Sequence, residues 1–124
     1  MHKNGLLIGA VLGLLSVVIG AFGAHGLKDI LVENGRLDVF ETAVKYQMYH
    51  AFALLFTSLL AEKIKGRWAT RAIFCFVTGV IIFSGSLYVL SISNIGIFGA
   101  ITPIGGLFFV AGWIYLIISI VKNT

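Results

Sequence analysis

The sequence predicts an all-α membrane protein, with four transmembrane helices in an antiparallel bundle. Apolar residues make up 59% of the 124 residues and charged residues only 11%, against about 45–50% and about 25% in soluble domains. The mean hydropathy is +1.03. At about 20 residues per span, the chain has room for about four crossings and for no further soluble domain.

The apolar runs form a single domain over residues 1–124. The four expected spans lie at about 5–24, 43–61, 72–90 and 103–121. The first run is too long for the core of a signal peptide, which measures about 7–15 residues, so we expect it to be retained. Residues 91–101 carry no charge, and we expect them to connect the third and fourth spans. Thr102-Pro103 is typical of the N-cap and first residue of a helix, which predicts that the fourth span begins there.

The only long polar stretch lies between the first two spans. It begins with a short segment whose apolar residues share one helical face while charges occupy the other, which is typical of a helix lying on a membrane surface. The apolar residues are Leu27, Ile30 and Leu31. Asn34-Gly35 is a strong turn signal, so we expect this amphipathic interfacial helix to end there and the next helix to begin near 36–38.

Small residues recur at helical spacing along several spans. In the first span they step by three or four and form one ridge, which allows a neighbouring helix to approach closely. The alternative is that glycine is simply frequent in membrane helices. The glycines expected to mediate helix packing are Gly5, Gly9, Gly13, Gly20, Gly79, Gly105 and Gly112.

A few polar side chains are predicted to gather in one half of the bundle. Because the third span ends where the second begins, residues near 84–88 should lie at the depth of His50. The candidate polar or binding site comprises His25, Tyr46, Gln47, His50, Ser84, Ser86 and Thr102. Several of these residues also have a structural explanation. Tyr46 fits an interfacial aromatic belt, His50 a buried neutral imidazole, and Ser84 and Ser86 local hydroxyl-to-backbone bonds.

The basic residues mark topology. If the four spans cross the membrane, six basic residues lie on the same side of it as the two termini. The other three, Lys28, Arg36 and Lys45, lie on the opposite side. The six are Lys3, Lys63, Lys65, Arg67, Arg71 and Lys122. This asymmetry predicts that both termini are cytoplasmic. Because the basic residues sit at the ends of apolar runs, the net charge of +4 does not indicate nucleic-acid binding.

Nothing in the sequence indicates catalysis, a metal or a cofactor. The single Cys75 excludes an intrachain disulfide and a cysteine-rich metal site. Ser84-Gly85-Ser86 lacks the Gly-x-Ser-x-Gly pattern of a nucleophile elbow. We therefore expect no enzyme activity, no metal site and no cofactor.

Four motifs in order suggest a family. The first is Gly20-Ala21-Phe22-Gly23-Ala24-His25-Gly26-Leu27. The others are Tyr46-Gln47-x-x-His50-Ala51, Phe83-Ser84-Gly85-Ser86-Leu87-Tyr88 and Thr102-Pro103-Ile104-Gly105-Gly106 with Gly112-Trp113. Together they resemble the bacterial domain-of-unknown-function family four-two-three, over essentially the whole chain. The resemblance implies a small multi-pass protein of the bacterial inner membrane, without an established activity.

Three functional hypotheses follow. The first is a structural or partner-binding membrane protein, in contact with the lipid bilayer and with further copies of itself or another membrane protein. The second is a small transporter or channel for a solute or ion, with the histidines in a polar site. The third is a protein that holds haem between His25 and His50.

Overall fold

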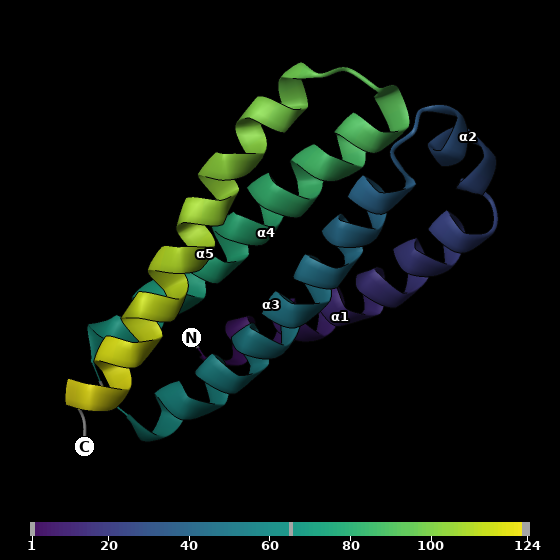
Figure 1. The fold of residues 1–124 in the computed structure, drawn as a ribbon. Coiled ribbons are helices and arrows are strands. Elements are labelled where there is room, and N and C mark those ends of the chain that lie inside the picture. Colours follow the sequence, from purple (N-terminus) through teal and green to yellow (C-terminus); the bar gives the residue numbers. More distant parts are fainter. Residues whose placement is uncertain (1, 65, 123–124) are drawn as a thin grey trace.

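The computed structural model describes residues 2–64 and 66–122, and these residues form five helices. They are α1 (His2–Ala24), α2 (Lys28–Glu33), α3 (Leu37–Lys63), α4 (Arg67–Ser93) and α5 (Ile97–Lys122). Four are long and run side by side in alternating directions, while α2 lies at the end of the molecule remote from both termini (Figure 1). The expected antiparallel arrangement of long helices with one short helix is therefore seen.

The long helices are arranged in chain order. α1 packs against α3, α3 against α4, and α4 against α5, which is the most extensive of these interfaces. α3 and α4 are thus the central pair. A core cluster of Ala53, Leu54, Ala72, Phe76 and Leu116 joins α3, α4 and α5.

Glycines allow the close approach of α5 to α4. A Cβ atom on Gly105 would meet the backbone of Phe83, and one on Gly79 would lie 2.5 Å from the ring of Phe109. A Cβ atom on Gly112 would lie 2.7 Å from the ring of Phe76. These three positions support the packing function predicted for them.

The α1 ridge packs on α3 at most of the predicted positions. A Cβ atom on Gly5 would meet Ser58, and one on Gly9 would lie 3.0 Å from the Leu55 side chain. Gly20 lies against Val44. Gly13 differs, because nothing lies within 4 Å of the place where its Cβ would be, so no close neighbour accounts for a glycine there.

The connection before the last helix is shorter than expected. α5 begins at Ile97, so Thr102 and Pro103 lie inside it, and the prediction of an N-cap at Thr102 was wrong. The Thr102 hydroxyl donates to the carbonyl of Phe98, one turn earlier, at 3.1 Å. Pro103 lies in the second turn of α5, where it removes one backbone N–H bond and its ring crowds the carbonyl group one turn earlier.

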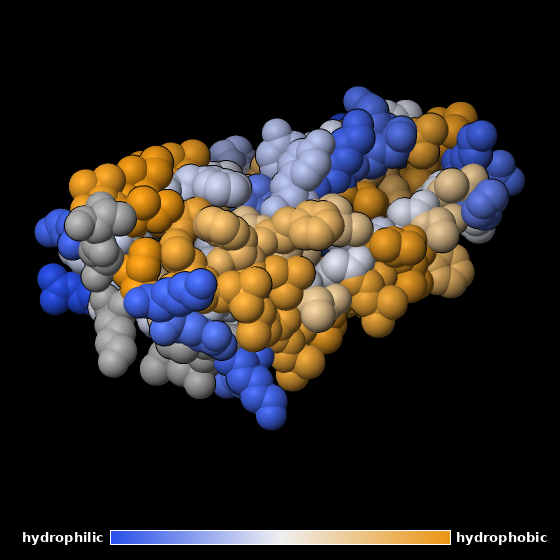
Figure 2. Space-filling view, turned by 90° about the horizontal axis from the view of Figure 1, so that it is seen from below, coloured by the Kyte–Doolittle hydropathy of each residue, from blue (hydrophilic) through white to orange (hydrophobic). Residues whose placement is uncertain are grey.

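Three of the described helices are long and apolar enough to cross a membrane: Lys3–Ala24, Arg67–Ser93 and Ile97–Lys122. α3 has 27 residues but does not reach the same hydropathy, because charges occupy both its ends and polar side chains its interior. A membrane crossing by α3 remains a prediction. Side chains on the face shown in Figure 2 are mainly apolar through the middle and hydrophilic toward the two ends.

The connection from α2 to α3 is fixed to the end of α4. Gly35 adopts φ +67°, as the predicted turn requires, and α3 begins at Leu37. The Asn34 amide donates to the carbonyls of Ser91 and Ile92 at 3.0 and 3.1 Å. In α2, Leu31 is fully buried, and the location of α2 at a membrane surface stays a prediction.

Candidate functional site

His50 has hydrogen-bond partners on both ring nitrogens. Its Nδ1 lies 2.7 Å from the carbonyl oxygen of Tyr46, and the indole Nε1 of Trp113 donates to its Nε2 at 3.1 Å. An indole N–H can only donate, so Nε2 must carry the lone pair and Nδ1 the proton. This assignment gives a neutral ring with both nitrogens satisfied, linking α3 to α5.

Aromatic side chains enclose the imidazole. The Phe109 ring stacks on it at a centroid distance of 3.6 Å and an interplanar angle of 9°. Phe76 and Trp113 lie around it at 5.6 and 5.9 Å, and the Tyr46 ring lies at 6.2 Å. His50 is 4% exposed, so these rings leave almost no approach for a solute.

Gln47 joins three helices. Its amide Nε2 donates to the carbonyl oxygen of Leu12 in α1 at 2.9 Å, and its Oε1 accepts from the Tyr88 hydroxyl in α4 at 2.6 Å. Gln47 is 3% exposed. The NH2 group and the oxygen of the Gln47 amide therefore each form a hydrogen bond to a different helix.

The predicted hydroxyl groups serve the same purpose. Ser84 of α4 donates to the carbonyl oxygen of Ala43 in α3 at 2.8 Å. The hydroxyls of Ser86 and Thr102 lie 2.6 Å apart and join α4 to α5. Because such bonds satisfy polar groups away from water, they hold the bundle together in a membrane.

His25 lies apart from these links. It is exposed in the turn after α1, whereas the aromatic rings around His50 come from α3, α4 and α5. Gln47, His50, Ser84, Ser86 and Thr102 form separate interhelical bonds, and His25 takes no part in them. A shared polar or binding site for these residues stays a prediction. The haem hypothesis loses support, because Trp113 occupies the imidazole nitrogen that would face a ligand.

Several partners were not predicted from the sequence. Trp113 and Phe109 complete the surroundings of His50, Tyr88 binds Gln47, and the carbonyl groups of Leu12 and Ala43 act as acceptors. Trp113 follows a glycine on the packed face of α5, which places it at the edge of that face. Helical spacing indicates that Trp113 lies at this edge. It does not identify the residue of another helix that Trp113 contacts.

Two buried hydroxyls of α3, those of Thr57 and Ser58, have no hydrogen-bond partner among the described residues. Neither lines the groove between α4 and α5 or the groove where α1, α2 and α3 meet. None of the seven predicted polar-site residues lines those grooves either. Gln47, His50, Ser84 and Ser86 are buried between helices, whereas His25 and Tyr46 are exposed outside these grooves.

Comparison with known proteins identifies the family. The family described as "Protein of unknown function (DUF423)" matches residues 19–106. The chain belongs to this family. The resemblance based on the four motifs is thereby confirmed.

Curated relatives match almost the whole chain. The UPF0382 membrane protein YwdK of Bacillus subtilis is 44% identical over 97% of this chain and 98% of its own length. The UPF0382 membrane protein SH2409 of Staphylococcus haemolyticus is 47% identical over 97% of each chain. No solved structure matches. Together with the apolar helices, these relatives identify the chain as a membrane protein of an uncharacterised family.

Proposed function

We propose that the chain is a four-span protein of the bacterial inner membrane, in which α3 crosses together with α1, α4 and α5. Its 27 residues span about 40 Å at 1.5 Å per residue, more than the roughly 30 Å hydrocarbon core. α3 packs between α1 and α4, both apolar enough to cross. Its polar groups Gln47 and His50 are bonded to those neighbouring helices and to α5, which reduces the cost of burying them.

The charge distribution supports an orientation with both termini in the cytoplasm. The beginnings of α1 and α4 and the ends of α3 and α5 lie at one end of the bundle (Figure 1). Of the basic residues that the structure describes, five belong to these helix ends and three do not: the five are Lys3, Lys63, Arg67, Arg71 and Lys122, and the three are Lys28, Arg36 and Lys45. Positive residues are retained on the cytoplasmic side of membrane proteins. α2 would then lie at the outer surface.

Single cysteines test this arrangement. In a Cys75→Ala background, a membrane-impermeant maleimide should label Glu33→Cys from outside intact cells and Glu62→Cys only after the cells are opened. Labelling of position 33 only from the cytoplasm would contradict the proposed orientation.

Within this arrangement the protein serves as a structural or partner-binding component of the membrane, associating through its outer faces with further copies or with another membrane protein. One observation carries the proposal: both nitrogens of His50, the most plausible solute-binding group, are engaged by Tyr46 and Trp113. A site for a solute or a proton would need a free lone pair or an open approach.

Native mass spectrometry of the protein released from its own membranes separates this proposal from a transporter. We expect wild type and His50→Phe to carry lipid or another polypeptide, and no small polar solute that depends on His50. Ser84→Ala is the matched control, because it removes a link at a similar depth without altering the imidazole. A solute lost in His50→Phe and retained in Ser84→Ala would overturn the structural proposal.

A further inference from the structure

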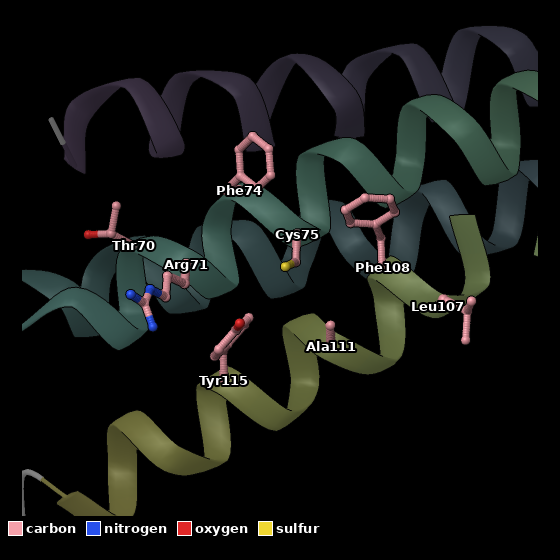
Figure 3. Close-up of a pocket in the computed structure, with 8 residues that line it drawn as sticks. All are labelled: Thr70, Arg71, Phe74, Cys75, Leu107, Phe108, Ala111 and Tyr115. Carbon is pink, nitrogen blue, oxygen red and sulfur yellow. The ribbon is translucent and has the colours of Figure 1, made fainter. Parts of the chain in front are cut away.

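A groove of about 510 Å³ lies between α4 and α5 (Figure 3). One end holds Arg71 and Tyr115, and the other holds Leu107 and Phe108, with Ala111 between them. Leu107 is 70% exposed. The groove is therefore polar at one end, apolar along its length and open to the side.

Basic residues gather around one aromatic ring beside the polar end. The cationic groups of Arg67, Arg71 and Lys122 lie 5.1, 4.9 and 5.4 Å from the centre of the Trp68 ring. Arg71 also lies 6.0 Å from the centre of the Tyr115 ring. Within the described part of the chain, no carboxylate forms an ion pair with any of the three. Like charges held so close together favour an anionic ligand.

We propose that this groove binds an anionic phospholipid, with its phosphate at Arg71 and an acyl chain running along α5 toward Leu107. The inference rests on the four-span arrangement proposed above, which places the polar end at the cytoplasmic surface. Leu107 and Tyr115 are separated by about 12 Å along the helix axis, less than half of the roughly 30 Å hydrocarbon core. The groove therefore lies within one leaflet.

The charges favour a lipid over a second copy of the chain. Arginine binds phosphate oxygens through two parallel hydrogen bonds, and basic pockets between membrane helices on the cytoplasmic side bind acidic headgroups. A second copy in the same orientation would bring few acids to this end, because four of its five acidic residues lie at the other: Asp29, Glu33, Asp38 and Glu41. An apolar helix in the groove would leave the three cations uncompensated.

The test uses the full chain in bilayers of phosphatidylcholine with a minor fraction of phosphatidylglycerol, followed by native mass spectrometry. Wild type should retain one phosphatidylglycerol per chain. Each cation near a membrane surface contributes about fivefold to such binding, so Arg71→Gln should weaken retention about fivefold and Arg71→Gln with Lys122→Gln about 25-fold. Ala111→Phe keeps every charge but fills the groove and should expel the lipid.

Lys3→Gln is the matched control, because it removes a cation from the same end of the molecule but from α1, away from the groove. It should leave retention unchanged. Equal retention of phosphatidylglycerol by wild type and the double variant would overturn the proposal, as would a phosphatidylcholine, a second copy or nothing in the groove. The cysteine labelling of intact cells described above separates the two proposals: correct topology without bound phosphatidylglycerol refutes only the lipid site, whereas wrong topology refutes the four-span arrangement.

Discussion

Replacing Gly105 by alanine should separate α4 from α5. The new Cβ would lie 2.7 Å from the Cα and 2.8 Å from the Cβ of Phe83. Unstrained carbon contacts are about 3.5–4.0 Å, so the helices would have to move apart by about 1 Å. The nearest atoms include backbone, which cannot rotate away as a side chain can.

The expected loss of stability follows from two opposing effects. Overpacking of this kind costs about 1–3 kcal/mol, while alanine gains about 1 kcal/mol over glycine in helix propensity. Gly105→Ala should therefore lower the free energy of unfolding by up to about 2 kcal/mol.

The adjacent Gly106 is a matched control, because nothing lies within 4 Å of the place where its Cβ would be. Gly106→Ala should keep only the gain in helix propensity. The assay is unfolding of the purified protein in mild detergent by increasing amounts of sodium dodecyl sulfate, followed by circular dichroism. Equal stability of the two variants would refute the close approach of α4 and α5 at Gly105.

Three further changes test other contacts by the same assay. A double-mutant cycle of Gln47→Leu and Tyr88→Phe should give a coupling energy of about 0.6–1.7 kcal/mol for their hydrogen bond, and strict additivity would argue against that bond. Gly35→Ala should cost about 1–2 kcal/mol because its φ is +67°, whereas Gly96→Ala, with no neighbour within 4 Å, should not be destabilising. Thr102→Val removes an interhelical hydroxyl pair and should cost about 0.6–1.7 kcal/mol; an unchanged stability would show that this pair contributes nothing.

Helix positions and packed faces could be predicted because both depend on local composition and spacing. Ala72, Cys75 and Gly79 share one helical face and are all buried in α4. Gly105 and Gly112, seven residues apart, are both buried in α5. A stripe of small residues identifies the face that packs, whatever helix packs on it.

The start of α5 was less accessible to prediction, because Thr102-Pro103 matches a helix start as well as it matches the interior of a helix. The structure distinguishes the two, because α5 begins at Ile97 and the Thr102 hydroxyl bonds to the carbonyl of Phe98 one turn earlier. The hydrogen-bond partners of His50 and Gln47 could not be predicted either, because a polar group in a membrane helix can bond to any neighbouring group at its depth. Helix direction predicted the depth but not the neighbour.

The buried polar groups bond between helices, and His50 is the residue at which this role is tested most directly. Nitrogen-15 NMR of the histidine-labelled protein in lipid bilayers distinguishes the two neutral forms of the ring. The geometry predicts the proton on Nδ1, toward Tyr46, and a cross-peak between Nε2 and the indole proton of Trp113. A proton on Nε2, or the absence of that cross-peak, would contradict the account and return His50 to the candidates for solute binding.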